Sequence, residues 1–284
     1  MQHILITGCS SGIGLTSAQY LKEKGFQVYP TARKSSDIKY LQSLGFDAIY
    51  CDMCDSLSIE KAVAECLEKS DHQLSAIINN AGYVEPGSCL QINRAILHAQ
   101  FDTNVFGAHE LTRVALPHFL KQGFGRVIYV SSVLGLVART HLGAYNASKY
   151  AVEGLADTLR LELSQHPNIH VSLIEPGPIA SKISNNAMKA IENRQQPANQ
   201  KGDHQLLEAM RQDPTSNPFQ LPPEAVAKAF YHAINSHRPR IRYPITKPAK
   251  LASIARRLLP DRLLDNLLTL AEPASQSELL PPPQ

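Results

Sequence analysis

A glycine-rich turn between an apolar run and a helical pattern is the feature that most constrains the fold of this chain. The run Ile4-Leu5-Ile6 is typical of a buried strand, and residues 15–24, closed by Gly25, have the pattern of a helix. The connection, Thr7-Gly8-Cys9-Ser10-Ser11-Gly12-Ile13-Gly14, has its glycines in the spacing G-x-x-x-G-x-G. This layout is typical of a dinucleotide site, because glycines let the backbone approach a pyrophosphate and the helix N-terminus supplies N–H donors. An ordinary tight turn is the weaker alternative, given three glycines in one connection.

Apolar runs alternate with helical patterns along the chain, which predicts a parallel sheet covered on both faces. The predicted strands are residues 4–7, 27–31, 48–51, 76–79, 127–131, 170–174 and 241–243. A chain of 284 residues, 43% of them hydrophobic, can bury the core of one large domain. We therefore predict an α/β, doubly wound Rossmann fold with a seven-stranded parallel sheet over residues 1–245, and a C-terminal helical extension with a disordered tail over residues 246–284.

Residues 183–223 interrupt the alternation of strands and helices. The segment is polar and is punctuated by Pro197, Pro214, Pro218, Pro222 and Pro223. Long connections of this kind are usually lids, binding loops or disordered segments. Because this one follows the sixth predicted strand, on the side where open α/β sheets bind ligands, we favour a substrate lid over disorder.

The segment Tyr145-Asn146-Ala147-Ser148-Lys149 combines a phenol and an ammonium group four residues apart. On a helix this spacing places both side chains on one face. A nearby cation favours the phenolate and lowers the tyrosine pKa, which suits a general acid/base. The alternative is a solvated helix edge, and the spacing alone does not exclude it.

Further motifs follow the glycine-rich turn along the chain. They are Asp52, Asn79-Asn80-Ala81-Gly82, Asn104, Ser131-Ser132, Tyr145 with Lys149, and Pro176-Gly177. In this order and spacing they resemble the short-chain dehydrogenase/reductase family, and more closely its NADP-dependent aldehyde, retinol and hydroxysteroid dehydrogenase branch. The resemblance implies an oxidoreductase that interconverts a lipophilic carbonyl compound (aldehyde, retinoid or steroid ketone) and its alcohol by hydride transfer. A 3-oxoacyl-thioester reductase of lipid synthesis and a nucleotide-sensing regulatory protein are the alternatives.

The resemblance also assigns roles within a catalytic tetrad. It implies that Tyr145 transfers the proton, Ser132 orients the substrate oxygen, Lys149 lowers the tyrosine pKa and holds the nicotinamide ribose, and Asn104 completes a water-linked proton path. Ser131 is adjacent to Ser132, and the family spacing to Tyr145 selects Ser132. The cofactor contacts expected from the turn, the strand ends and the resemblance are Gly8, Ser10, Ser11, Gly12, Ile13, Gly14, Arg33, Lys34, Asp52, Met53, Asn80, Ala81, Gly82, Tyr145, Lys149, Pro176, Gly177, Ile179 and Ser181. Ser181 stands where the family usually has Thr.

The end of the second predicted strand indicates which cofactor is used. NAD sites often place an acidic side chain there, on the ribose 2′-hydroxyl. This strand ends Ala32-Arg33-Lys34, and Arg33 can form two charge-assisted hydrogen bonds with a 2′-phosphate. The sequence therefore favours NADP(H), with a solvated basic turn as the alternative.

Composition excludes several other classes. A formal net charge of +3 is too small to indicate nucleic-acid binding. With no signal-peptide pattern, no spanning segment and five scattered Cys, we expect a cytoplasmic protein with free thiols. The C-x-x-C of Cys51 and Cys54 lacks partner ligands, so no metal site is expected.

Two surfaces are candidates for larger contacts. The family commonly pairs the helices expected over residues 95–122 and 145–165 across a two-fold axis, which predicts a homodimer or homotetramer. Eight apolar residues were candidates for that contact: Leu111, Val114, Ala115, Phe119, Val152, Leu155, Leu159 and Leu163. The leucine-rich stretch 251–268, with Arg256, Arg257 and Arg262, could cap the pocket, pack on a subunit, or make weak contact with a membrane surface.

Overall fold

Seven parallel strands form one sheet in the order β3-β2-β1-β4-β5-β6-β7. This computed structural model describes residues 1–90, 92–181, 187 and 217–271. The strands are β1 (His3–Ile6), β2 (Gln27–Ala32), β3 (Ile49–Tyr50), β4 (Leu74–Asn79), β5 (Gly125–Val130), β6 (Ile169–Glu175) and β7 (Arg242–Pro244). Every predicted strand is present, and each bound lies within two residues of its expected position. The doubly wound Rossmann fold is thus confirmed.

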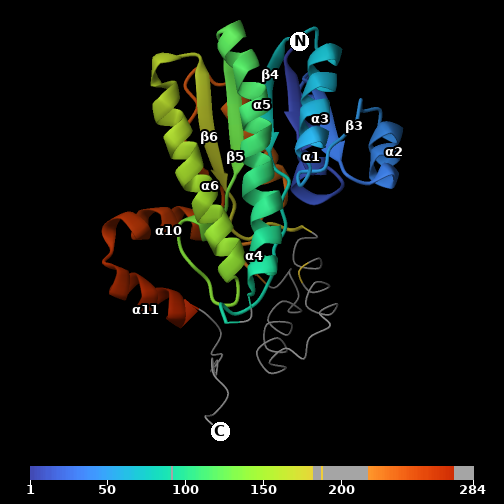
Figure 1. The fold of residues 1–284 in the computed structure, drawn as a ribbon. Helices are drawn as coiled ribbons and strands as arrows, with labels where there is room; N and C mark the ends of the chain where they lie inside the picture. Colours follow the sequence, from blue (N-terminus) through green and yellow to red (C-terminus); the bar gives the residue numbers. More distant parts are fainter. Residues whose placement is uncertain (91, 182–186, 188–216, 272–284) are drawn as a thin grey trace.

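Helices cover both faces of the sheet (Figure 1). The helices α1 (Gly12–Glu23), α2 (Ser35–Ser43) and α9 (Glu224–Asn235) pack on one face. The helices α3 (Ser56–Lys69), α5 (Gly107–Gln122) and α6 (Gly143–Glu162) pack on the other. Short 3-10 turns, η2 (Val133–Gly135) and η3 (Leu163–Gln165), precede and follow α6. Successive strand residues alternate between these two layers, so Leu5 belongs to one core and its neighbours Ile4 and Ile6 to the other.

The helix predicted over residues 95–122 is divided. It consists of α4 (Arg94–Phe101), a π-helical turn η1 (Asp102–Phe106) and α5. A π-turn adds a residue to one helical turn and frequently marks a functional site. Here it contains Asn104, one of the predicted catalytic residues.

The candidate dimer residues are mostly used within the chain. Five of them, Leu111, Ala115, Phe119, Val152 and Leu163, are buried in the core beneath α5 and α6. The other three, Val114, Leu155 and Leu159, are half-buried against the same core. A homodimer or homotetramer stays a prediction, and any contact through these helices must use other residues for most of its area.

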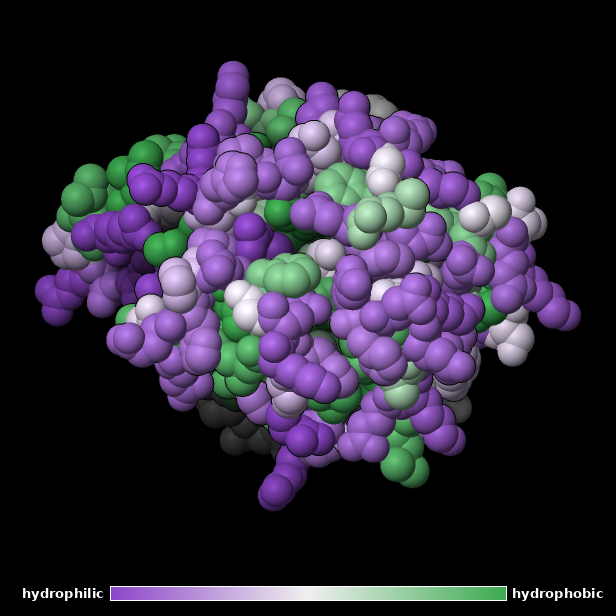
Figure 2. All heavy atoms as spheres, turned by 90° about the horizontal axis from the view of Figure 1, so that it is seen from above, coloured by the Kyte–Doolittle hydropathy of each residue, from purple (hydrophilic) through white to green (hydrophobic). Residues whose placement is uncertain are grey.

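The lid and the C-terminal segment are described only in part. Most of the expected lid, residues 182–186 and 188–216, and the expected disordered tail, residues 272–284, lie outside the described residues. Near the end of the expected lid, Leu221 exchanges backbone hydrogen bonds with Pro178 and Ala180, which follow β6. The leucine-rich stretch forms two helices, α10 (Lys247–Leu258) and α11 (Asp261–Ala271), on either side of Pro260. The surface at the end where the strands begin is mostly hydrophilic, with hydrophobic atoms in smaller groups (Figure 2).

Candidate active site

A cavity of about 420 Å³ lies at the carboxyl ends of the strands. Residues that follow β1, β2, β4, β5 and β6 line it. Every predicted cofactor contact is among them: Gly8, Ser10, Ser11, Gly12, Ile13, Gly14, Arg33, Lys34, Asp52, Met53, Asn80, Ala81, Gly82, Tyr145, Lys149, Pro176, Gly177, Ile179 and Ser181. Ser132 also lines the cavity, so the fold gathers the glycine-rich turn and three of the four predicted catalytic residues around one space.

The glycine-rich turn has a backbone that other residues adopt with difficulty. Gly8 has φ +72° and Gly12 has φ +57°, both in the left-handed region. A Cβ built on Gly8 would lie 2.7 Å from the Cα of Ala81, so the two segments that follow β1 and β4 touch. The helix α1 begins at Gly12 with no acidic residue in its first turn. Its N–H groups therefore face the cavity as an anion-binding terminus.

Asn80 ties the turn after β1 to the turn after β4. Its side-chain Nδ2 donates to the carbonyl oxygens of Thr7 at 2.7 Å and Gly8 at 3.2 Å. In return, the Thr7 hydroxyl accepts from the backbone N–H groups of Asn80 and Ala81, each at 3.0 Å. These reciprocal bonds hold the glycine-rich turn in place, so Asn80 has a structural role beside the cavity that it lines.

Arg33 and Lys34 are exposed at the end of β2 and line one end of the cavity, next to the buried Ala32. Asp37, on the first turn of α2, lines the same end. Two cations and one carboxylate therefore surround this part of the cavity.

Ser132 and Ser131 point to different surroundings. The Ser132 hydroxyl accepts from the Leu134 N–H at 3.1 Å and donates to the Pro176 carbonyl at 3.5 Å. It also lies beside the Tyr145 phenol and lowers the pKa of that group. The Ser131 hydroxyl instead lies buried on the side of Glu153 and has no hydrogen-bond partner among the described residues. Consecutive residues leaving a strand face opposite ways, and here that places Ser132 beside Tyr145.

The electrostatics of Tyr145 and Lys149 differ from the simple expectation of a lowered tyrosine pKa. Burial raises the pKa of Tyr145 to about 12, and the hydrogen bond from Ser132 opposes that rise. Burial lowers the pKa of Lys149 to about 8, and the Glu153 carboxylate opposes that fall. The Lys149 Nζ donates to the Val130 carbonyl oxygen at 2.8 Å and lies 5.6 Å from the centre of the Tyr145 ring. Among the chain's own groups, desolvation thus outweighs the attraction between the phenolate and the ammonium.

Asn104 lies behind the cavity wall. Its Oδ1 accepts from the Tyr83 N–H, and its Nδ2 donates to the Tyr83 carbonyl and the Ser148 hydroxyl, each at 3.1 Å. A Cβ on Gly82 would lie 3.2 Å from its Oδ1 and 3.7 Å from the Lys149 Nζ. Asn104 therefore fixes the segment after β4 close to Lys149, through contacts that its π-helical turn makes available.

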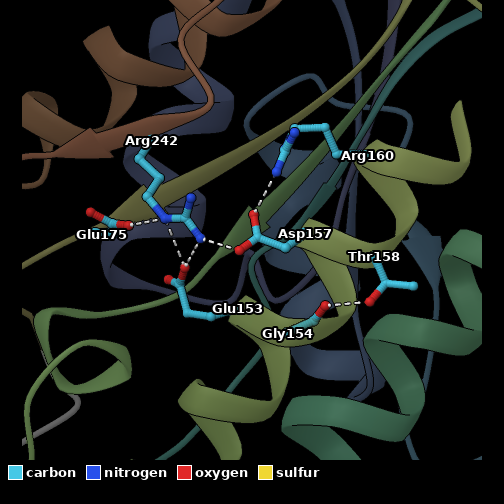
Figure 3. Close-up of polar contacts among 7 residues, drawn as sticks. All are labelled: Glu153, Gly154, Asp157, Thr158, Arg160, Glu175 and Arg242. Atoms are coloured by element: carbon cyan, nitrogen blue, oxygen red, sulfur yellow. Dashed lines mark hydrogen bonds and ion pairs between the residues drawn. The ribbon is translucent and has the colours of Figure 1, made fainter. Parts of the chain in front are cut away.

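A cluster of ionisable side chains around Arg242 supports the outer side of the site (Figure 3). Arg242 of β7 lies 3.0 Å from Glu153 and 2.7 Å from Asp157, both on α6, and 3.2 Å from Glu175 at the end of β6. Arg160 also pairs with Asp157, at 3.3 Å. Glu153 follows Lys149 by one helical turn, and Glu175 directly precedes the cavity-lining residues Pro176 and Gly177. The cluster therefore joins three elements just behind the cavity.

Some cavity residues escaped sequence reasoning. Asp37, Cys51, Tyr83, Thr103 and Val130 line the cavity in addition to the predicted contacts. Tyr83 directly follows Asn79-Asn80-Ala81-Gly82, and Thr103 directly precedes Asn104. Their positions next to these motifs could therefore have predicted that they line the cavity. In the described ranges, no group of three or more His, Cys, Asp or Glu side chains is placed to hold a metal ion.

Comparison with known proteins identifies the family. A family model described as short chain dehydrogenase matches residues 2–192. The chain belongs to the short-chain dehydrogenase/reductase family. It is 40% identical over 270 residues to the uncharacterised oxidoreductase YbbO of Escherichia coli K12, covering 93% of each chain. It is 32% identical over 279 residues to the NADPH-dependent 3-dehydrocapnine reductase of Ornithobacterium rhinotracheale, covering 94% of this chain and 96% of the reductase. A short-chain dehydrogenase/reductase from Burkholderia phymatum, solved in complex with NAD, has a TM-score of 0.76 and 26% identity, covering 96% of this chain and 98% of its own.

The family and the coarse activity predicted from the motifs are thus confirmed. As a short-chain dehydrogenase/reductase, the protein is an oxidoreductase that acts on CH–OH or carbonyl groups. The family match ends at residue 192, whereas the alignment with YbbO covers 93% of the chain.

The buried Glu175 predicts a pH dependence of stability. Its side chain is fully buried, and burial, with the neighbouring Glu153 carboxylate, raises its pKa from 4.5 to about 8. The folded chain then holds a proton that the unfolded chain has lost, so this contribution to stability is present below pH 4.5 and is lost as the pH rises through about 8. We expect Glu175→Gln, which stays neutral, to gain stability relative to wild type as the pH rises across that window, by at most about 1.4 kcal/mol per pH unit.

Urea denaturation at several pH values between 5 and 8.5 measures this difference. Glu162→Gln, at an exposed position at the end of α6, is the matched control and should leave the pH slope of the wild type unchanged. Parallel stability curves for Glu175→Gln and wild type would show that Glu175 is ionised in the folded protein throughout this range.

Proposed function

We propose that this protein is an NADP(H)-dependent oxidoreductase that interconverts a lipophilic carbonyl compound and its alcohol, with Tyr145 as the general acid/base. The observation that carries the proposal is one cavity that joins the glycine-rich turn to Ser132, Tyr145 and Lys149. A nucleotide-sensing protein has no need of a phenol, a hydroxyl and an ammonium group converging beside the nucleotide site. The family membership supports the same conclusion.

The residues present fit a dinucleotide. Gly8 and Gly12 adopt the left-handed backbone conformation, and Gly8, Gly12 and Gly14 bring no Cβ atoms to the turn and the first residues of α1. Backbone N–H groups and the helix dipole there favour a pyrophosphate. Asp52 and Met53 line the cavity beyond β3, where the adenine would lie in the arrangement that the family resemblance implies.

NADP(H) is favoured over NAD(H) by charge. Arg33 and Lys34 line the end of the cavity beside β2, where the 2′-phosphate of NADP would lie. The similar 3-dehydrocapnine reductase is NADPH-dependent by name. Two observations favour NAD instead: Asp37 offers a carboxylate at the same end, and the Burkholderia phymatum enzyme was solved with NAD. We give more weight to the two cations. Arg33 and Lys34 together outweigh the single carboxylate of Asp37, so a 2′-phosphate at this end of the cavity would still meet a net positive charge.

The catalytic roles follow from the hydrogen bonds. A bound nicotinamide supplies hydride transfer to or from carbon. Tyr145, with its pKa raised to about 12, holds its proton at neutral pH and donates it to the substrate oxygen during reduction. Ser132, whose hydroxyl lies beside the Tyr145 phenol and lowers its pKa, binds the same oxygen. The Lys149 ammonium attracts negative charge on that phenol, and its bond to the Val130 carbonyl fixes its position.

The apolar part of the cavity lining bears on the substrate class. Val133 and Leu134 directly follow Ser132, and Leu142 and Gly143 shortly precede Tyr145, but these four residues are not among those lining the cavity. Val130, Ile179 and Tyr83 do line it and provide apolar surface. A panel of an aldehyde, a steroid ketone, retinal and an acetoacetyl thioester, each with NADPH, tests the substrate. Turnover confined to the thioester would favour the 3-oxoacyl reductase alternative.

The cofactor preference predicts a specific outcome of mutation. We expect wild type to have a higher kcat/KM for NADPH than for NADH. The double variant Ala32→Asp, Arg33→Leu should reverse this preference, because it adds a hydroxyl acceptor and removes the phosphate partner. Loss of hydrogen bonds to a charged group costs about 1.5–3 kcal/mol, so kcat/KM for NADPH should fall at least about tenfold. Steady-state kinetics at one pH and salt concentration provide the measurement.

Asp37→Asn separates the two interpretations of this end of the cavity. If Arg33 binds a 2′-phosphate, removing the Asp37 charge should leave NADPH kinetics equal or improved. A larger loss with NADH than with NADPH, together with equal use of both cofactors by wild type, would assign Asp37 to a ribose hydroxyl and contradict the NADP(H) proposal.

Substitutions of Tyr145 and Lys149 should affect kcat and NADPH affinity differently. Tyr145→Phe should lower kcat at least about 100-fold, the usual minimum for general acid catalysis, while NADPH affinity measured by fluorescence titration changes little. Lys149→Ala should impair both, because Lys149 faces both the phenol and the cavity. Tyr150→Phe is the matched control: Tyr150 is on the same helix and bonds the Leu136 carbonyl outside the cavity. Tyr145→Phe activity within tenfold of wild type would refute the assignment.

A further inference from the structure

Six large apolar side chains are exposed on the two C-terminal helices. They are Leu251, Ile254 and Leu258 of α10, and Leu263, Leu267 and Leu270 of α11. Leu258 is 74% exposed and Leu270 81% exposed, so these side chains are nearly as accessible as in an extended chain. Figure 1 shows both helices at one side of the molecule, outside the layers that cover the sheet. Large apolar side chains exposed in such number on two consecutive helices indicate an interaction surface.

On α10 the apolar stripe points away from the protein. Leu251, Ile254 and Leu258 are spaced i, i+3 and i+7, which places them on one face of a helix. Ala249, the buried residue of α10, lies on the opposite face by the same geometry. A surface helix normally turns its apolar stripe toward the core. In α10 the orientation is reversed, so its apolar stripe is not needed for folding of the described body.

The helix α11 repeats this arrangement. Leu263, Leu267 and Leu270 are spaced i, i+4 and i+7 and are exposed, while Leu264 is buried beside them. Its polar residues occupy the other half of the helix circumference. Each of the two helices therefore offers an exposed apolar stripe alongside residues that hold it to the protein.

Basic residues accompany these stripes. The helix α10 contains Lys247, Lys250, Arg256 and Arg257 and no acidic residue. Arg256 pairs with Asp261 at 2.6 Å across the link to α11. Residues 247–271 contain five of the 28 Lys and Arg and two of the 25 Asp and Glu, so this short segment carries the whole formal charge of +3. By helical geometry, Lys247, Lys250 and Arg257 border the exposed stripe of α10.

We propose that the exposed face of α10 and α11 docks on an anionic lipid surface, with the leucine and isoleucine side chains at the headgroup boundary and the Lys and Arg groups on lipid phosphates. Apolar residues flanked by cations are the pattern of helices that lie in a membrane interface. The contact is one of surface docking, since no helix in the part of the chain that the structure describes has the length and hydropathy to cross a bilayer.

A second copy of the chain is disfavoured as the occupant. A two-fold contact places the same patch on both partners. It would bring the cations of one α10 against those of the other, and like charges at an interface oppose association. An anionic surface supplies both the apolar environment and the opposite charge.

The docking helices are attached directly to the wall of the cavity. Thr246 caps α10 by accepting from the Ala249 N–H and is fully buried. A Cβ on Gly177, which lines the cavity, would collide with the Thr246 hydroxyl. Docking through α10 would therefore hold the cavity close to the lipid.

Vesicle co-sedimentation of the full chain tests the proposal. We expect binding to vesicles of phosphatidylcholine with phosphatidylglycerol, weaker binding to pure phosphatidylcholine, and loss of binding at high salt. Lys250→Glu with Arg257→Glu should lower partitioning at least about tenfold, since each basic group near the surface contributes about 1 kcal/mol. Lys61→Glu with Lys228→Glu is the matched control: it makes the same charge change at exposed positions on α3 and α9 and should retain most of the binding.

The apolar contribution is tested separately. Leu251→Ser with Leu258→Ser should also lose vesicle binding, whereas Leu57→Ser with Leu161→Ser, exposed on α3 and α6, should not. Far-ultraviolet circular dichroism and Tm verify that each variant is folded. Three results would overturn the proposal: no binding by wild type, equal loss in the control variants, or self-association in sedimentation velocity that Leu251→Ser with Leu258→Ser abolishes. The last would assign the surface to a second copy. If a chain ending at Ala271 binds vesicles and wild type does not, the occupant of the surface is the chain's own residues 272–284.

Discussion

The hydrogen bonds between Asn80 and the turn after β1 are the interaction on which the site depends. In this sheet the chain reverses its direction of winding between β1 and β4, and the segments that leave these strands diverge there. Four hydrogen bonds of the Asn80 side-chain amide and the Thr7 hydroxyl join the segment after β1 to the segment after β4. Gly8 and Ala81 consequently touch, and the N-terminus of α1 is fixed toward the cavity. Without these hydrogen bonds, the glycine-rich turn would not be held in a fixed position relative to the catalytic groups.

Burial determines the properties of the catalytic groups as much as their spacing does. Tyr145 and Lys149 share a helix face, but both are enclosed at the end of the sheet, and desolvation drives both toward their neutral forms. Ser132 and Glu153 oppose these shifts from the two sides. In the cluster around Arg242, this arginine joins the Glu153 carboxylate to Glu175, the last residue of β6, which directly precedes Pro176. The pKa values of Tyr145 and Lys149 thus depend both on burial and on polar groups that oppose its effect.

The sheet and the glycine-rich turn were predictable from the sequence. Central parallel strands are buried on both faces, so they appear as apolar runs, and the glycine spacing directly reflects backbone conformations that only glycine adopts easily. The π-turn around Asn104 was not predictable, because one added residue hardly disturbs helical periodicity. The contact of Arg242 with Glu153, 89 residues away, is set by packing alone. The direction of the Tyr145 pKa shift was missed for the same reason, since it depends on enclosure.

The placement of charge has a consequence for how the protein moves before it binds anything. The segment 247–271 holds the entire formal excess, so the remainder of the chain is balanced. Such a molecule has a lopsided charge distribution and experiences a torque in an external field. Near any negatively charged boundary it would rotate to lead with its C-terminal helices before contact. This reorientation acts over roughly a Debye length, about 8 Å at physiological ionic strength, and therefore affects the rate of productive encounters more than their final strength.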